Sequence, residues 1–245
     1  MTEERYHTTP EWAIHARGIT KLFGSHFALR GVDLEIGDGE SVVIFGPNGA
    51  GKTTLIKVLA TIMNPSSGRI TVAGQALKRD AEEIRRRIGV VTHHTFLYNN
   101  LTAYENLEFY CRMYDVPRVK ERIGEVVSMV QMASRLNDRV GILSRGMQQR
   151  LSIARALLHK PTIILLDEPE TGLDQEAVPL LWGALEIEER KPTIVLTTHN
   201  LERGLHLGQR ILILARGKVV CQMSTEDLEL DDLKQTYQHA TAGRP

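Results

Sequence analysis

Three short, mostly apolar runs stand out along the chain: SVVIFG (41–46), TIILLD (162–167) and TIVLTTH (193–199). Each is rich in valine and isoleucine, and none alternates between apolar and polar residues as a half-exposed strand does. Continuous apolar runs are typical of strands that are buried on both faces, as in a parallel sheet covered by helices. We therefore expect these three runs to form the central strands of a parallel sheet.

Two other segments have the pattern of antiparallel strands. Residues 28–40 (ALRGVDLEIGDGE) alternate in polarity and turn on glycines. Residues 210–223 (RILILARGKVVCQM) consist of two apolar stretches around Arg216-Gly217, which predicts a hairpin. These segments indicate an antiparallel addition to the parallel core.

The middle of the chain, about 95–160, has apolar residues at helical spacing. One of its helices is expected to begin after Thr102, because Glu105 follows three residues later and completes a capping box. We therefore expect a single domain over 1–245, with an α/β core at about 1–94 and 161–245, an antiparallel β subdomain, and an inserted helical subdomain at about 95–160.

Charge and composition narrow the function classes. The 245 residues include 30 Lys+Arg and 30 Asp+Glu, and this balance argues against a non-specific nucleic-acid binder or a binder of anionic membranes. The two cysteines, Cys111 and Cys221, fit a reducing compartment better than a disulfide framework. With no apolar run near 20 residues and a polar N-terminus, we expect a cytoplasmic protein without a nucleic-acid partner. Any membrane role would then need a separate chain.

The segment GPNGAGKT (46–53) matches the phosphate-loop pattern G-x-x-x-x-G-K-[ST] between a predicted strand and a predicted helix. Its glycines let backbone N–H groups point at phosphate oxygens, and the helix N-terminus adds a positive dipole end. Lys52 would reach the β- and γ-phosphates, while the Thr53 hydroxyl would hold Mg²⁺. A chance glycine-rich turn is the alternative, and the strand–helix context disfavours it. The predicted nucleotide-binding residues here are Gly46, Pro47, Asn48, Gly49, Ala50, Gly51, Lys52, Thr53 and Thr54.

A second acidic element ends the run IILLDE (163–168). The strand would deliver Asp167 to its carboxyl end, next to the phosphate loop if the two strands neighbour each other. Asp167 is a candidate Mg²⁺ ligand, and Glu168 a candidate for polarising the attacking water. The alternative for Glu168 is an ordinary surface acid.

Four motifs follow one another along the chain: the phosphate loop, LSRGMQQR (143–150), LLDEP (165–169) and TGLD (171–174). Together they resemble the ATP-binding-cassette (ABC) ATPases along nearly the whole chain. The resemblance implies ATP and Mg²⁺ as cofactors, ATP hydrolysis coupled to transmembrane transport, and a motor made of two ATPase subunits. It also implies an integral membrane subunit as partner and a peripheral position on the cytoplasmic face of the cell membrane. A GTPase is disfavoured, because the sequence has no N-K-x-D-type motif for recognising the guanine base.

The resemblance assigns roles to further residues. Phe23 lies where the family places an aromatic residue under adenine; a core phenylalanine is the alternative. Ser144 and Gly146 of the signature would touch the γ-phosphate bound by the other subunit, and Ser144 also reads as a helix N-cap. Asp174 would lie in the loop at the dimer interface. His199 corresponds to a histidine that senses the γ-phosphate, and the alternative is a plain loop residue. Arg145 and Met147 depart from the family's usual signature.

A tandem of histidines raises a separate question. In IGVVTHH (88–94), Thr92 and His93 stand where the family has proline and a glutamine that contacts Mg²⁺ and the attacking water. Imidazole can replace part of that hydrogen bonding. We favour His93 as a catalytic and metal-contacting substitute over a structural loop residue or a metal or haem ligand. If residues 93 and 94 are extended, their side chains point to opposite faces and do not chelate together.

The longer motif matches are most similar to the ATP-binding subunit of the haem exporter of c-type cytochrome biogenesis. This predicts a motor subunit of a haem exporter. Alternatives are an exporter of drugs, lipids or polysaccharide, or a soluble ABC regulator such as a translation factor. The membrane subunit is expected to dock on the helical lobe near Phe96, Leu97 and Tyr98, although Leu97 could equally pack inside.

Overall fold

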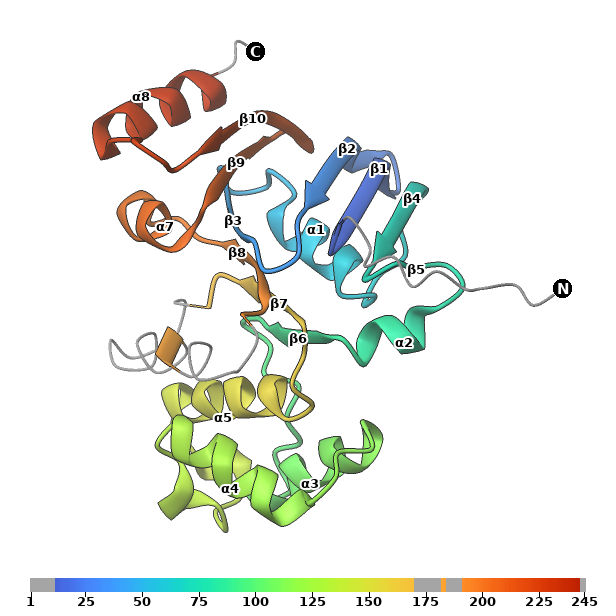
Figure 1. Cartoon of the computed structure of the whole chain (residues 1–245), viewed down its shortest axis with the longest axis vertical. Helices are drawn as coiled ribbons and strands as arrows, with labels where there is room; N and C mark the ends of the chain where they lie inside the picture. The colour runs from blue at the N-terminus through green and yellow to red at the C-terminus, as the bar shows by residue number, and fades with distance from the viewer. Residues whose placement is uncertain (1–11, 170–181, 184–190, 243–245) are drawn as a thin grey trace, which may run out of the picture.

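A computed structural model describes residues 12–169, 182–183 and 191–242. Its centre is a six-stranded sheet in the order β10-β9-β3-β8-β7-β6 (Figure 1). All neighbouring strands are parallel except β10, which runs antiparallel to β9. The strands are β3 (Ser41–Phe45), β6 (Ile88–Val91), β7 (Ile163–Asp167), β8 (Thr193–Thr197), β9 (Arg210–Ala215) and β10 (Lys218–Ser224). The expected parallel strands are confirmed.

The central strands are apolar throughout because both faces of this sheet are covered. Along β3, Val43 and Phe45 pack into a hydrophobic cluster shared with the helical lobe. Val42 and Ile44 point the other way, into a cluster shared with α1 (Lys52–Leu59) and the second sheet. Side chains alternate between the faces of a strand, so a run without polar positions is what a doubly covered strand requires.

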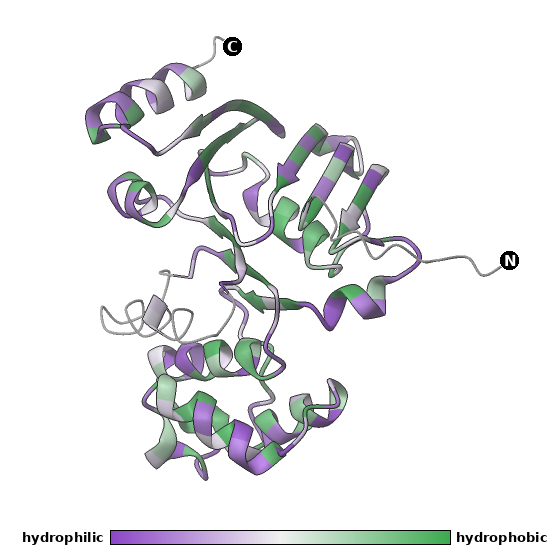
Figure 2. Cartoon of the chain, in the orientation of Figure 1, coloured by the Kyte–Doolittle hydropathy of each residue, from purple (hydrophilic) through white to green (hydrophobic). Residues whose placement is uncertain are grey.

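The second sheet is antiparallel and has the order β2-β1-β4-β5. Its strands are β1 (Ile14–Phe23), β2 (His26–Ile36), β4 (Ser67–Val72) and β5 (Gln75–Ala76). Hydrophilic and hydrophobic positions alternate visibly along these strands in Figure 2. The antiparallel strand expected within 28–40 is confirmed as β2. The predicted hairpin is confirmed as β9–β10, whose turn residues Arg216 and Gly217 both have positive φ, at 50° and 77°.

The helices α3, α4 and α5 gather in a lobe below the large sheet in Figure 1. The capping box is confirmed: Glu105 N donates to Thr102 Oγ1 at 3.1 Å, and Thr102 N donates to Glu105 Oε2 at 2.7 Å. Among the described residues, the helices besides α1 are α2 (Ala81–Arg85), α3 (Ala103–Met113), α4 (Val119–Met129), α5 (Arg145–Leu157), α7 (Leu201–Leu207) and α8 (Leu230–Thr241), with 3₁₀ turns at Ala133–Arg135 and Val140–Ile142.

The lobe is attached to the outer edge of β6. The Arg87 carbonyl accepts from Ile163 N of β7, so the carbonyls of the even-numbered residues face away from the sheet. Side chains from α5 and the turn after it cover them. These edge contacts are Gln149 to the Thr92 carbonyl (3.0 Å), Arg155 to that of Val90, and His159 to that of Ile88 (3.1 Å). The free edge is therefore closed by one helix of the lobe.

Candidate active site

The phosphate loop joins β3 to α1, and its shape depends on glycine. A Cβ at Gly46 would lie 2.2 Å from the Leu214 carbonyl oxygen, and one at Gly51 would lie 2.5 Å from that of Ala28. Gly51 caps α1 with a φ of 107°, a conformation that L side chains rarely adopt. The backbone is thus folded into a turn that presents the start of α1, the arrangement that binds phosphate.

Lys52 is the first residue of α1 and is only 5% exposed. Its ammonium donates to the Gly46 carbonyl at 2.8 Å and lies 3.5 Å from Glu168 Oε1. A buried cation held at the mouth of a phosphate loop, with one carboxylate nearby, has the charge needed to attract the terminal phosphates of a nucleotide.

Asp167 ends β7 and is 1% exposed. It accepts hydrogen bonds from Thr53 Oγ1 at 3.1 Å and from Thr197 Oγ1 at 2.8 Å, both at its Oδ1. β7 does not neighbour β3, because β8 lies between them. The two motifs still meet, since parallel strands end at one edge of the sheet and α1 starts there. A carboxylate and a hydroxyl are the hard oxygen ligands that Mg²⁺ prefers, so these residues fit that ion.

Glu168 turns the chain out of β7. Its φ is 47°, which is uncommon outside glycine. Its N–H donates to the carbonyl and the hydroxyl of Thr197, at 3.1 and 3.0 Å. Its Oε1 lies 2.6 Å from His199 Nε2. The strained backbone therefore places one carboxylate oxygen between Lys52 and His199, a kind of local strain that recurs at functional sites.

A cavity of about 510 Å³ lies between the phosphate loop, Glu168 and the β1–β2 hairpin. Phe23 lines this cavity and is 47% exposed, so the alternative of a core phenylalanine is wrong. Lys21 Nζ lies 5.3 Å from the centroid of the Phe23 ring. His26 also lines this cavity, and no sequence motif singled it out. A signal was available, because His26 stands three residues after Phe23 across a Gly-Ser turn.

The structure places His93 elsewhere. It lines a second cavity of about 640 Å³, together with His94, Arg145 and Gln148. No contact within the described residues joins His93 to Thr53 or Asp167. The extended chain at residues 93 and 94 that would put the two histidine rings on opposite faces is not formed, and the ring centroids are 4.1 Å apart. Thr92 Oγ1 accepts from His94 N at 3.0 Å and donates to the His94 carbonyl at 2.9 Å, so the chain bends instead of staying extended.

Ser144 is an N-cap, as predicted: its Oγ accepts from Met147 N at 3.3 Å at the start of α5. Ser144 is exposed and Gly146 is partly buried in the first turn. Neither lines the cavity at Lys52. Asp174 lies outside the described residues. Within the described parts of the chain, no group of three or more His, Cys, Asp or Glu side chains could hold a metal ion.

Known proteins are similar to this chain in sequence and in fold. The model of the family described as ABC transporter matches residues 29–171. The linearmycin resistance ATP-binding protein LnrL of Bacillus subtilis is 34% identical over 88% of this chain and 70% of its own length. The Nod factor export ATP-binding protein I of Rhizobium sp. is 36% identical over 88% of this chain and 72% of its own. The dimeric bacterial ABC transporter cassette MJ0796 superposes with a TM-score of 0.78 at 31% identity, over 88% of this chain and 100% of that one.

These relatives bear on the cargo. Their names refer to drug resistance and to Nod factor export, and neither refers to haem. The predicted fold is confirmed, and so is an ATPase coupled to transport. The resemblance to a haem exporter in cytochrome c biogenesis gains no support, and the alternative of another exporter is the better supported one.

Proposed function

Because this chain belongs to the ABC transporter family of ATP-binding proteins, we propose that it is the ATP-hydrolysing subunit of an exporter of drug-like or lipid-like compounds. The observation that carries this choice is the similarity, over 88% of the chain, to ATP-binding proteins named for linearmycin resistance and Nod factor export. Haem export is the second candidate, because the longer sequence motifs resemble those of the haem exporter's ATP-binding subunit.

ATP would lie in the cavity that joins Phe23 to the phosphate loop. The Phe23 ring would stack on adenine, and the N–H groups of the loop 46–54 would bind the phosphates. The Lys52 ammonium, freed from the Gly46 carbonyl, would move onto the β- and γ-phosphates. This placement requires Mg²⁺ near Thr53 and Asp167, where the ion would offset the charge of the terminal phosphates.

Glu168 is our candidate for the group that polarises water. The water oxygen would form a bond to the γ-phosphorus, while the bond from that phosphorus to the β–γ bridging oxygen breaks. The proton of the water would pass to the Glu168 carboxylate or to the released phosphate. His199, 2.6 Å from Glu168, would orient this carboxylate and contact the γ-phosphate.

Two groups would join the site only in the working assembly. ABC ATPases form dimers, as the cassette MJ0796 does. Ser144 and Gly146 would then contact the nucleotide held by the second subunit. The exposed N-cap of α5 at Ser144 supports this, because a helix N-terminus attracts an anion. His93 would reach Mg²⁺ and the water after the helical lobe moves toward the core.

A membrane subunit is the proposed second partner. No described helix is long and apolar enough to cross a bilayer. Phe96 and Tyr98 are 42% and 51% exposed beside the second cavity, while Leu97 packs against the main core cluster. We propose that the membrane subunit binds this face on the cytoplasmic side. In this proposal the core, about 1–94 and 161–245, binds ATP, and the helical lobe, about 95–160, binds the membrane subunit.

The cargo proposal is tested by co-expressing the chain with the membrane subunit encoded beside its gene and reconstituting the complex in lipid nanodiscs. ATP turnover is then measured with an amphiphilic antibiotic, a phospholipid analogue and haem. We expect the antibiotic or the lipid to stimulate turnover several-fold. Stimulation by haem alone would reject the proposal in favour of haem export, and a failure to assemble with any membrane subunit would favour a soluble regulator.

A further inference from the structure

We propose that Arg145 selects the membrane subunit by pairing with a carboxylate on the segment that docks. This inference rests on the proposed function, in which a membrane subunit binds the face at Phe96 and Tyr98. It adds the chemistry of that partner, which is an acidic side chain next to apolar ones. Arg145 is one of the two residues that depart from the family's usual signature, so its role would be particular to this chain.

Arg145 reaches the second cavity from the first turn of α5. Arg145, Gln148 and Gln149 all line this cavity of about 640 Å³, since residues three and four apart share one face of a helix. Ser144 and Gly146, which would contact the second nucleotide, do not line it. The start of α5 therefore presents Arg145 to the cavity and leaves the proposed nucleotide contact to its neighbours.

The lining of this cavity carries positive charge. Among the described residues that line it, none is an aspartate or a glutamate, and the first turn of α5 has no acidic residue either. The N-terminus of α5 adds the positive end of a helix dipole. His93 and His94 line the cavity from the loop after β6, and each neutral imidazole has one N–H to donate. An anionic group is therefore the complement of this cavity.

The loop that carries the two histidines is fixed to α5. Gln149 is only 4% exposed, and its Nε2 donates to the Thr92 carbonyl at 3.0 Å. The Thr92 hydroxyl accepts from His94 N at 3.0 Å and so closes the bend. Both walls of the cavity are thus formed before a partner binds, which lowers the entropic cost of binding.

The Arg145 guanidinium is exposed and available for a partner. Within the part of the chain that the structure describes, no hydrogen bond or ion pair engages it. A guanidinium binds a carboxylate through two parallel N–H bonds, a geometry that a lysine ammonium does not reproduce. Arg145 can therefore recognise an acidic side chain and not merely attract negative charge.

The cavity continues into an apolar face, which favours a peptide segment as its occupant. Phe96 lines the cavity and is 42% exposed. Tyr98 and Phe109, 51% and 42% exposed, pack edge to face with ring centroids 5.4 Å apart. A peptide can offer apolar side chains to these rings and an acidic one to Arg145. An inorganic anion or a lipid head group would use only the charged part.

The test measures binding of the chain to phosphatidylcholine nanodiscs that hold the membrane subunit encoded beside its gene. Arg145→Glu should weaken binding at least about tenfold, because like charges replace a charge-assisted pair. Arg145→Lys should lose less, since it keeps the charge but not the two-bond geometry. The control is Lys120→Glu, the same charge change at an exposed residue of α4 outside this cavity, which should bind normally.

A second arm looks for the carboxylate itself. Acidic residues in the cytoplasmic loops of the membrane subunit are changed to lysine one at a time. One of these changes should weaken binding of the wild-type chain and restore binding of Arg145→Glu. The affinity of each isolated variant for an ATP analogue should stay unchanged, because Arg145 does not line the cavity at Lys52.

The outcomes separate this inference from the proposed function. If Arg145→Glu binds like the wild type, or if no change in the membrane subunit restores its binding, the carboxylate pairing is wrong and the transport function stands. An equal loss in Lys120→Glu would reduce the effect to net charge and also reject the pairing. Binding of the wild type, but not of Arg145→Glu, to protein-free nanodiscs with equal parts of phosphatidylcholine and phosphatidylglycerol would assign the cavity to lipid head groups. If the wild type binds no nanodisc that holds the membrane subunit, the transport function is wrong and this inference fails with it.

Discussion

Single side chains decide the chemistry around Glu168. One carboxylate oxygen lies 3.5 Å from a buried ammonium and 2.6 Å from an imidazole nitrogen, and a left-handed backbone holds it there. Lys52 is in contact with loop carbonyls and this carboxylate, so binding a triphosphate must exchange those contacts for phosphate oxygens. Phosphates supply stronger, charge-assisted bonds, which favours the exchange.

Lys52→Ala should therefore reduce ATP turnover by at least about 100-fold, as the loss of one charge-stabilising donor commonly does. The fold should remain cooperative, because the change removes a charge and leaves the apolar core intact. Turnover assays and thermal unfolding check both statements. Lys57→Ala, in the last turn of the same helix, is the matched control and should keep nearly full activity. Near wild-type turnover in Lys52→Ala would remove the phosphate loop from the mechanism.

His93→Gln should retain turnover, whereas His93→Ala should lose about 100-fold, the lower end of the range for a group that assists proton transfer. His94→Ala is the control: its ring lies against that of His93, but we expect this change to have little effect on turnover. If the His94 change is the damaging one, our alignment of this loop with the family glutamine is off by one residue.

The sequence predicted the residues of this site better than their surroundings. Lys52, Thr53 and Asp167 come together because motifs and strand ends constrain them. The bend at Thr92 escaped prediction, since it depends on a side-chain hydrogen bond that apolar patterning does not encode. His26 escaped it because a lone histidine at a strand start has no motif.

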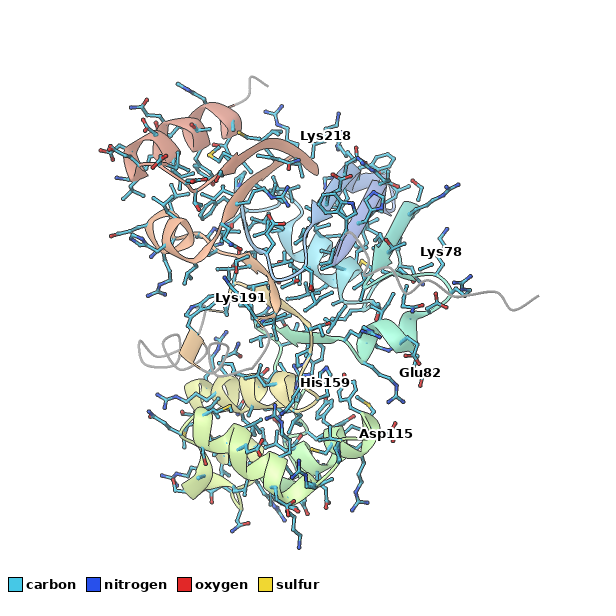
Figure 3. All side chains as sticks on the ribbon, in the orientation of Figure 1. Lys78, Glu82, Asp115, His159, Lys191 and Lys218 are labelled. Atoms are coloured by element: carbon cyan, nitrogen blue, oxygen red, sulfur yellow. The ribbon has the colours of Figure 1, made fainter. Side chains whose placement is uncertain are left out.

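The helix α5 and the strand β6 form the main joint between lobe and core. Their edge contacts include His159, which Figure 3 marks at the end of α5 between the lobe and the sheet. Its Nε2–H donates to the Ile88 carbonyl, and its ring stacks on Tyr114 with centroids 4.2 Å apart. Burial lowers the pKa of His159 to about 4, an effect that nearby Arg155 reinforces. The joint therefore needs the neutral imidazole.

This joint makes stability depend on pH with a definite sign. The unfolded chain protonates His159 near pH 6.5, but the folded protein does so only near 4. The unfolded state thus binds more protons in that window, and stability is lost as pH falls from about 6.5 to 4, by on the order of 3 kcal/mol. Urea unfolding at several pH values should show a shallower decline for His159→Gln than for the wild type. His239→Gln, an exposed change, should decline like the wild type, and equal slopes in all three proteins would refute the claim.

Helices and strands with a regular pattern of apolar and polar residues could be predicted from the sequence, whereas those with an interrupted pattern could not. The doubly covered strands β3, β7 and β8 follow directly from their apolar runs. β1 was not predicted, because polar residues and register shifts between Ala16 and Thr20 interrupt its alternation. The order of the strands in the sheet was not predicted either, because it depends on tertiary packing and not on local sequence patterns.

For the molecule as a whole, the exposed face at Phe96 and Tyr98 is the proposed contact with the membrane subunit. Tyr98→Asp, alone and with Phe96→Asp, should release the chain from membranes that contain the co-expressed partner, because a carboxylate cannot be buried at an apolar contact. ATP affinity should stay unchanged. Ile62→Asp, an equally exposed apolar position on the core, is the control and should stay bound. If the double variant remains on the membrane, the contact lies elsewhere.

We propose that the Ser144 end of a second subunit completes the hydrolytic site. The most direct measurement is the solution mass of Glu168→Gln by light scattering, with ATP and Mg²⁺, and again with ADP. We expect a dimer with ATP, a monomer with ADP, and a monomer with either nucleotide when Ser144→Arg is added to Glu168→Gln. A Glu168→Gln protein that stays monomeric at high concentration and hydrolyses ATP normally, or a dimer that ignores Ser144→Arg, would contradict it.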